Sequence, residues 1–566
     1  MHDLIIRGGV VVDGSGGERK RADIAIDGER ITDVGRIGTK AHRVIDAAGC
    51  LVTPGWVDVH THYDGQATWD PILAPSSWHG VTTVVMGNCG VGFAPVRPGD
   101  EDFLIELMEG VEDIPGSALA EGIAWRWETF AEYLDALDAM PRAIDVATQV
   151  PHGAVRAYVM GRRCNSNDDL PSDAEIAEMA AIVRAGIEAG ALGFSSSRTL
   201  LHKDKHGIHV PGTFAGSDEM LALGLSMKGL DHGVFELVSD HLGNDDEWAW
   251  VTRFAAETGR PVTLVATSAA AYEGNKIFRI AESARQQGIE VRPQLAGRPT
   301  GVLHGLQSNF HVFVRHPTFA TQLAGLPLQE MVARMREPAI RRQILSERSS
   351  LTRTISSASL DELLWQVFPL GERPNYEPNR DDSVAGIAQR RGEDPFAVMY
   401  DALVANDGRE LFYQPLGGYA HYNFDTFRTN MQHPNILFGL SDGGAHCGVI
   451  ADAGMPTFIL THWARDRSKG ERLPLEYLVR KLSFDTASAY GLDDRGLLEA
   501  GRLADINVID FDRLNLQRPE AVYDLPAGGK RLVQRVVGYR HIVKRGTPIF
   551  ADGEHTGALP GRLVRG

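Results

Sequence analysis

The feature that most constrains this chain is a long alternation of apolar, strand-like runs with helical segments between about residues 55 and 490. One helical segment, 173–189, follows a capping Ser172, carries acids in its first turn and has apolar residues at helical spacing. Strands that alternate with helices are typical of a parallel sheet. Seven or eight such units over ~430 residues predict a (β/α)8 barrel with insertions. The strand-like runs include 82–86, 144–150, 191–195, 234–238, 262–265 and 436–440.

Short strand-like segments lie on both sides of this alternation. Residues 4–14 and 23–31 are β-rich with glycine breaks, and β-strands return at 505–510 and 535–539. We expect the two ends to pair in one small β-sandwich beside the barrel. The predicted domains are therefore a composite of 1–54 with 491–566, and a barrel over 55–490.

Two stretches exceed what a plain barrel needs. The first, at about 98–142, carries acids and aromatics, and the second, at about 297–415, reads as mostly helical. Either stretch could form a lid above the strand ends. A packing or dimer-forming elaboration is an equally good interpretation, so both stay open.

Composition excludes several classes of protein. The 566 residues are 43% hydrophobic and 23% charged, which excludes disorder as the dominant state. A net charge of −17 argues against nucleic acid or an anionic membrane as the main partner. The four cysteines are too scattered for a disulfide framework, and neither a signal peptide nor a membrane-spanning run is present. We expect a soluble, cytoplasmic protein.

A His-x-His pair provides the first sign of chemistry. His60 and His62 end the apolar run 55–59, and a period of two places both imidazoles on one face of a strand. At the end of a first barrel strand that face points into the barrel mouth. Two imidazoles about 7 Å apart at Cα can bind one zinc-like ion. The flanking Pro-Gly-Trp-Val-Asp and Tyr-Asp favour a metal site over two packing histidines.

Residues 51–64 resemble the first-strand signature of the metal-dependent amidohydrolase superfamily. The stretch 80–90 (GVTTVVMGNCG) is similar to the second-strand motif of its N-acyl-D-amino-acid deacylase branch. The stretches 149–156 (QVPHGAVR), 441–446 (SDGGAH) and 494–505 match the same branch. The resemblance covers the barrel and both flanking β segments. It implies a barrel with a small β domain from both termini, and metal-dependent hydrolysis of an amide.

The resemblance also implies roles for a cysteine and a carboxylate. In this branch the cysteine of the second-strand motif is a metal ligand, which implies that role for Cys89; a buried apolar packing role is the alternative. Asp442 follows the apolar run 436–440, at the predicted end of the last strand. A carboxylate there can touch the metal and take a proton from metal-bound water, whose pKa the metal lowers toward ~7. As general base and then acid, Asp442 would pass that proton to the leaving nitrogen.

The sequence departs from the branch at two places. The branch normally has a histidine at the end of the fifth strand and another at the end of the sixth, but 234–240 and 262–267 offer none. His241 is either a displaced ligand or a loop residue. We therefore expect one zinc ion rather than two, held by His60, His62 and Asp442 with Cys89, although another divalent metal fits the same donors.

Four further side chains are candidates for substrate binding. Arg198 could hold a carboxylate through two hydrogen bonds, or pair with an acid of the protein. His202 could replace a lost ligand, contact substrate or serve only in packing. His446 could orient Asp442 or bind substrate. Tyr63 flanks the histidine pair, and the adjacent Asp64 could orient a ligand imidazole.

The leading hypothesis is a hydrolase that deacylates a small N-acylated amino acid, with the D-isomer suggested by the resemblance. An alternative keeps the site but acts on a cyclic amide or another acyl conjugate. A third hypothesis is a non-catalytic scaffold, which the missing histidines favour and the intact His60, His62 and Asp442 disfavour. The composition is compatible with a homodimer or a larger assembly.

Overall fold

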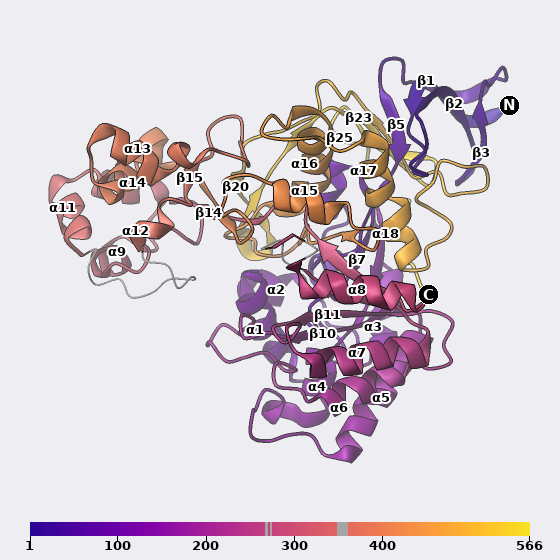
Figure 1. Cartoon of the computed structure of the whole chain (residues 1–566), viewed down its shortest axis with the longest axis horizontal. Coiled ribbons are helices and arrows are strands. Elements are labelled where there is room, and N and C mark those ends of the chain that lie inside the picture. The colour runs from indigo at the N-terminus through magenta and orange to yellow at the C-terminus, as the bar shows by residue number, and fades with distance from the viewer. Residues whose placement is uncertain (267–269, 272–273, 348–359) are drawn as a thin grey trace.

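The computed structural model describes residues 1–266, 270–271, 274–347 and 360–566, which form a mixed α/β fold (Figure 1). Its centre consists of two parallel sheets. The smaller contains β6 (Trp56–Asp58), β7 (Val81–Met86) and β8 (Asp145–Thr148). The larger has the order β17-β13-β12-β11-β10-β9. Its strands are β9 (Val150–Pro151), β10 (Gly193–Arg198), β11 (Val234–Ser239), β12 (Val262–Val265), β13 (Val291–Leu295) and β17 (Leu437–Phe438).

The strands of both sheets are largely buried, which explains why the sequence shows them as nearly continuous apolar runs. Hydrogen bonding among the described residues does not close the two sheets into one barrel. Strands β8 and β9 follow one another along the chain, and a single parallel bridge joins Thr61 to Gly443. This bridge brings the segments after β6 and β17 side by side, and the predicted metal ligands His60, His62 and Asp442 lie on these segments.

Helices connect successive parallel strands, as the alternation predicts. The predicted helix at 173–189 is confirmed as α5 (Asp173–Glu188), and Ser172 with Glu175 forms its capping box. The connecting helices include α4 (His152–Met160), α5, α6 (Ser217–Leu225), α7 (Asp245–Thr258), α8 (Lys276–Gln286) and α15 (Asp425–Met431). The last parallel strand, β17, is followed by α16 (Met455–Phe458), a π-helix over Ile459–Asp466, α17 (Leu475–Leu482) and α18 (Phe484–Ala489).

The two ends of the chain share one nine-stranded sheet of order β25-β24-β23-β18-β5-β1-β2-β3, in which β4 also pairs with β1. The antiparallel pairing of β5 with β18 joins the N-terminal part to the C-terminal part. A two-layered sandwich and its boundaries stay a prediction. The strands are β1 (His2–Val11), β2 (Lys20–Asp27), β3 (Arg30–Gly35), β4 (Ala41–Asp46), β5 (Leu51–Pro54), β18 (Ile506–Ile509), β23 (Tyr539–Lys544), β24 (Thr547–Ala551) and β25 (Glu554–His555). Two short antiparallel pairs lie between β18 and β23: β19 (Asn515–Leu516) with β22 (Val536–Val537), and β20 (Glu520–Leu525) with β21 (Gly529–Val533).

A buried ionic cluster ties the C-terminal strands to the parallel sheets. Asp145, the first residue of β8, accepts hydrogen bonds from Arg495 at 2.7 Å and Arg545 at 3.0 Å, and Lys544 lies 2.8 Å away. Burial alone would raise the pKa of Asp145, but these three cations hold it well below its usual range. Removing the carboxylate would leave buried cations unpaired, which is strongly destabilising.

Two helical insertions differ in how they pack. The first contains α1 (Glu101–Glu112), α2 (Gly116–Gly122) and α3 (Phe130–Asp138), whose apolar residues belong to the main hydrophobic core. The second has its own core over 306–412, and Figure 1 shows its helices standing apart from the sheets. Residues 348–359 of the predicted 297–415 insertion lie outside the described residues. The second insertion contains α9 (Pro317–Gln322), α10 (Leu328–Met335), α11 (Pro338–Ser346), α12 (Leu360–Leu363), α13 (Val384–Arg391) and α14 (Pro395–Leu403), with the antiparallel strands β14 (Thr300–His304), β15 (Phe368–Pro369) and β16 (Phe412–Leu416).

Across the described ranges, no helix has both the length and the apolar character needed to cross a membrane.

Candidate metal centre

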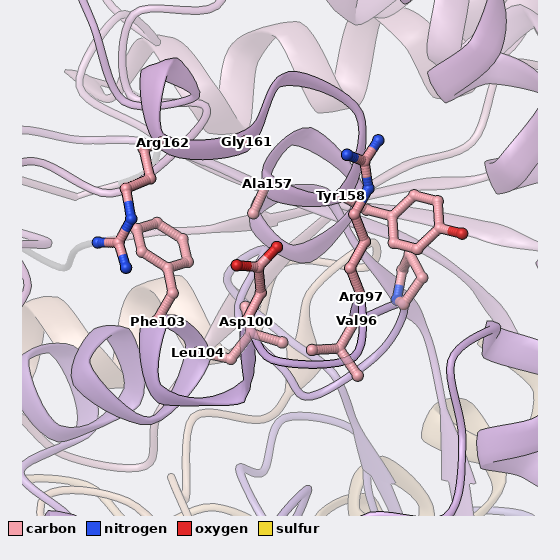
Figure 2. Close-up of a pocket in the computed structure, with 10 residues that line it drawn as sticks. Val96, Arg97, Asp100, Phe103, Leu104, Ala157, Tyr158, Gly161 and Arg162 are labelled. Atoms are coloured by element: carbon pink, nitrogen blue, oxygen red, sulfur yellow. The ribbon is translucent and has the colours of Figure 1, made fainter.

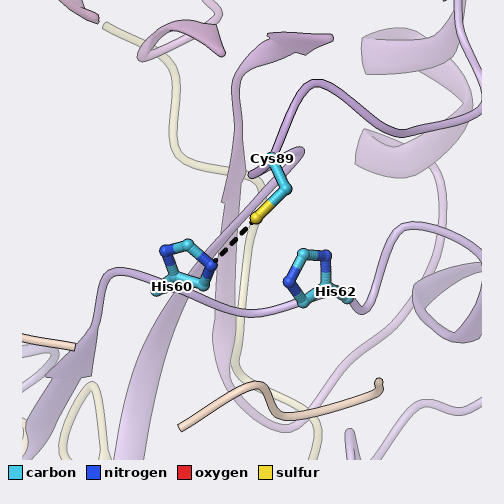
Figure 3. Close-up of side chains that lie close together, drawn as sticks. All are labelled: His60, His62 and Cys89. Carbon is cyan, nitrogen blue, oxygen red and sulfur yellow. Dashed lines mark hydrogen bonds between the residues drawn. The ribbon is translucent and has the colours of Figure 1, made fainter. Parts of the chain in front are cut away.

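His60, His62 and Cys89 converge at the ends of two adjacent strands (Figure 3). The histidines follow β6 and Cys89 follows β7, which is the neighbour of β6 in the sheet. One potential ligand atom from each residue lies within 4.8 Å of the other two, and all three side chains are buried. Cys89 Sγ lies 3.3 Å from His60 Nε2.

Asp442 approaches the same point from the segment after β17. Its Oδ1 lies 3.7 Å from His60 Nε2 and 4.0 Å from His62 Nε2. In a tetrahedral zinc site, Zn–N bonds of about 2.0–2.1 Å and Zn–S bonds of about 2.3 Å place neighbouring ligand atoms roughly 3.3–3.6 Å apart. The two imidazoles and the thiol therefore form a cluster whose donor atoms suit one zinc-like ion, and the Asp442 carboxylate lies beside this cluster at slightly longer distances.

Three polar side chains from other elements hold these candidate ligands in place. Gln294 of β13 lies with Oε1 2.8 Å from His60 Nδ1, so Nδ1 carries the donated proton and Nε2 is left with a free lone pair. Glu236 of β11 accepts the main-chain N–H of Cys89 at 2.8 Å. Glu112, the last residue of α1, has Oε1 3.3 Å from His62 Nδ1.

Burial controls the charge of the cluster. It lowers the pKa of His60 to about 4 and raises the pKa of Asp442 to about 8. Burial, followed by the nearby Glu236, also raises the pKa of the Cys89 thiol well above its usual value. Each group is thus driven toward its neutral form in the protein alone. A divalent cation would supply the missing positive charge, which favours the thiolate and the carboxylate.

The backbone is strained at this cluster. Cys89, Asp442 and His446 are non-glycine residues with φ values of 55°, 49° and 51°. L-residues avoid this left-handed region, and such strain costs of order 1–3 kcal/mol per residue. Strained residues of this kind gather where a side chain must be held in one direction, which is consistent with a functional site.

The candidate substrate residues are placed differently from the ligands. Arg198 pairs with the buried Glu247, and Tyr63 donates a hydrogen bond to Ser76 Oγ at 2.8 Å. Both side chains therefore have partners within the protein; for Arg198 this is the alternative that the sequence leaves open. His202 Nδ1 lies 2.8 Å from Ser197 Oγ, and His446 Nε2 lies 3.6 Å from Glu112 Oε2.

Neither Asp64 nor His241 is a partner of the cluster in the described part of the chain. Asp64 Oδ2 accepts the main-chain N–H of Gly87 at 3.2 Å, and His241 donates its own N–H to Ser239 Oγ at 3.0 Å. The predicted end of the sixth strand, Thr267, lies outside the described residues.

Glu112, Gln294 and Glu236 are functional candidates that sequence reasoning missed. A charged residue in the apolar run 234–238 is a signal that could have drawn attention to Glu236. Gln294 gives a weaker signal of the same kind in β13. Glu112 gives none, because nothing local in α1 shows that its last residue meets a histidine fifty residues earlier.

A separate pocket lies at the other end of α1 (Figure 2). Asp100, Phe103 and Leu104 line it from the first turn of this helix, and Ala157, Tyr158 and Arg162 line it from the region of α4. At 1.5 Å per residue, Phe103 and Glu112 are about 13 Å apart along the helix axis. The pocket therefore does not include the candidate metal ligands.

Comparison with known proteins identifies the class. The chain matches the model of the amidohydrolase family over residues 43–550. It is 32% identical to the N-acyl-D-aspartate deacylase of Alcaligenes xylosoxydans xylosoxydans, with 99% of this chain and 95% of the relative covered. The D-aminoacylase of the same organism is 26% identical, with 99% and 97% covered. The structure of the Bordetella bronchiseptica N-acyl-D-glutamate deacylase, crystallised with zinc and a phosphonate inhibitor, shares the fold at a TM-score of 0.61 and 24% identity, with 100% of both chains covered.

The chain therefore belongs to the amidohydrolase family. Within that family it falls in the D-aminoacylase branch, and it is a hydrolase that acts on carbon–nitrogen bonds other than peptide bonds.

Proposed function

We propose that this protein deacylates N-acyl-D-amino acids with one zinc ion held by His60, His62, Cys89 and Asp442. The observation that carries the proposal is the buried cluster of two imidazoles and one thiol, with the Asp442 carboxylate 3.7 and 4.0 Å from the two Nε2 atoms. The names of the relatives support the substrate class, since they describe a D-aminoacylase and deacylases of N-acyl-D-aspartate and N-acyl-D-glutamate.

Each ligand has a task that follows from its surroundings. His60 and His62 present Nε2, while Gln294 and Glu112 face their other ring nitrogens. The Cys89 thiolate and the Asp442 carboxylate supply negative charge opposite the imidazoles. When bound, a zinc-like ion would supply Lewis acidity, acidifying water and polarising the amide carbonyl.

Asp442 is the group that moves the proton. Its Oδ1 lies 3.7 and 4.0 Å from the two imidazole Nε2 atoms, where it would be within reach of a water molecule held in an open position of a bound ion. A carboxylate there accepts the proton of the attacking water and gives it to the amide nitrogen as that nitrogen leaves. The positive φ of Asp442 holds the side chain in this direction.

We further propose that the two parallel sheets act as one (β/α)8 barrel over 55–490, in which β8 and β9 count as one strand, with 1–54 and 491–566 forming a β-sandwich beside it. The bridge between Thr61 and Gly443 and the succession of β8 and β9 support this arrangement, because they relate the two sheets at both edges. The site then lies at the carboxyl ends of the strands, where barrel enzymes carry their chemistry.

The alternatives have distinct outcomes in one experiment. Protein purified without added metal or chelator is analysed for metal, and N-acetyl-D-amino acids, N-acetyl-L-amino acids and cyclic amides are tested as substrates. We expect about one zinc ion per chain and turnover of the N-acetyl-D-amino acids. Turnover of cyclic amides alone would favour the same site with another substrate, and absence of both bound ion and turnover would favour a scaffold.

Substitutions of the candidate ligands test whether bound zinc and turnover both depend on the His60 and His62 site. Replacing both His60 and His62 by Ala is expected to remove the ion and reduce turnover to background. The matched control replaces the exposed His42 and His421 by Ala and should leave both unchanged. N-acyl turnover that persists in the metal-free His60→Ala/His62→Ala protein would remove the metal from the mechanism.

A further inference from the structure

Glu112 has an environment that its place in the sequence does not explain. It is the last residue of α1, yet its carboxyl is buried between two histidines. Oε1 lies 3.3 Å from His62 Nδ1, and Oε2 lies 3.6 Å from His446 Nε2. The main-chain oxygen of Glu112 also accepts the N–H of His446.

The position is unfavourable for a carboxylate in two respects. Negative charge at the carboxyl end of a helix is destabilised by the helix dipole. A buried carboxylate without a cation is also destabilised by its lost hydration. No lysine or arginine pairs with Glu112 in the part of the chain that the structure describes, and neither Glu112 Oε2 nor His62 Nδ1 makes a hydrogen bond there. The packing of α1 alone would be served better by an apolar side chain.

The geometry around His62 supplies the reason for a carboxylate here. His62 Nε2 faces Asp442 Oδ1 at 4.0 Å, so its other ring nitrogen, Nδ1, faces Glu112. Histidines that bind metal usually donate the second ring N–H to a carboxylate or carbonyl, which fixes the tautomer and makes the ligand nitrogen more basic. Gln294 already holds that position for His60, at 2.8 Å.

We propose that Glu112, contributed by the first insertion, is a positioning residue of the metal centre that fixes His62 for metal binding and raises the affinity for zinc. The inference rests on the proposed function. Gln294 faces His60 with an amide oxygen, and Glu112 faces His62 with a carboxyl oxygen. Glu112 would act through His62 and would not itself touch a bound ion.

The test measures zinc affinity directly, without reference to turnover. Metal-depleted wild type, Glu112→Gln and Glu112→Ala are titrated with zinc against a chromophoric chelator. Loss of an outer partner of a metal ligand typically weakens binding 10- to 100-fold. We expect Glu112→Ala to fall by about that factor, and Glu112→Gln to fall less because an amide oxygen can still accept the Nδ1 proton. The control Glu109→Gln, on the same helix, should bind zinc like wild type.

A second measurement separates positioning from folding. Cobalt-loaded protein shows thiolate-to-cobalt absorption when Cys89 is a ligand, and this band should persist at higher cobalt concentration in Glu112→Gln. Zinc affinity within twofold of wild type in folded Glu112→Ala and Glu112→Gln would overturn the inference while leaving the proposed function intact. If wild type binds no zinc at all, the proposed function fails together with it. Should Glu112→Ala not fold, the near-isosteric Glu112→Gln decides the question.

Discussion

Both helical insertions appear in the sequence as stretches longer than a plain barrel needs, but among the described residues only the first places a residue beside the candidate metal ligands. The first, with α1 to α3, packs into the main hydrophobic core and ends its first helix at His62. The second, with α9 to α14, encloses a core of its own between 306 and 412. None of the candidate site residues lies in the second insertion. The comparison indicates that an insertion contributes chemistry when it shares the core of the sheets.

Sharing a core also couples the first insertion to a neighbouring loop. Lys205, in the loop after β10, lies 3.1 Å from Glu106 of α1, and the same loop carries His202. A displacement of α1 would therefore reach the site through both Glu112 and this loop. In the second insertion the pairing of Arg341 with Asp401 lies within the insertion, but Asn309 donates a hydrogen bond to Asp113 of the first insertion at 3.0 Å.

The largest expected difference between the insertions comes from the same cavity-forming substitution, Leu→Ala, made once in each of them. Leu107 of α1 and Leu403 of α14 are both buried, and Leu→Ala in a core costs about 2–5 kcal/mol. We expect both variants to lose stability, measured by hydrogen exchange in the affected helices. Only Leu107→Ala should also bind zinc more weakly, because Glu112 follows on the same helix. Equal loss of zinc affinity in Leu403→Ala would show that the second insertion is coupled to the site as well.

Much of this architecture could be predicted from local sequence. Strand alternation and the capped helix at 173–188 are local patterns, and both are present. Whether the strands close into a barrel depends on pairing between distant segments such as those of Thr61 and Gly443, which no local pattern specifies. No local pattern specifies the independent core of the second insertion either, because it brings together residues as far apart in the sequence as Leu306 and Phe412.

The candidate site divides in the same way. His60 and His62 could be found because a period of two in one strand places them together, and Cys89 and Asp442 because motifs carry them. Their outer partners could not. Glu112 and Gln294 meet the histidines only through the tertiary fold. A glutamate in the apolar run of β11 predicts that the buried Glu236 has a polar partner, but it does not predict that this partner is the main-chain N–H of Cys89.

A second pair of variants compares the two insertions at glycines that lie close to the backbone of another segment. A Cβ at Gly110 of α1 would lie 2.1 Å from the carbonyl carbon of Asp204, and one at Gly386 of α13 would lie 2.5 Å from the oxygen of Asp381. Overpacking of this kind typically costs about 1–3 kcal/mol. Gly110→Ala and Gly386→Ala should both lower the midpoint of thermal unfolding.

The two glycine variants are expected to differ in their effect on substrate and zinc binding. Gly110→Ala pushes apart α1 and the loop that carries His202, so KM for the N-acyl-D-amino acid should rise as zinc affinity falls. Gly386→Ala strains contacts inside the second insertion, and its KM should equal that of wild type. A Gly110→Ala protein that is less stable but kinetically normal would uncouple the first insertion from the site.

The smallest effect concerns surface ion pairs. Lys205 lies 3.1 Å from Glu106 and 3.6 Å from Glu109, and Arg341 makes two hydrogen bonds to Asp401 at 2.7 and 2.8 Å. Exposed pairs add little to stability and are screened by salt, so Lys205→Ala and Arg341→Ala should unfold almost as wild type does. Lys205 nevertheless links the His202 loop to α1. Its loss should therefore raise KM by about twofold at low salt and by less as salt increases, whereas Arg341→Ala should leave KM unchanged at every salt concentration. A salt-independent KM in Lys205→Ala would mean that the close backbone contact at Gly110 alone holds the loop against α1.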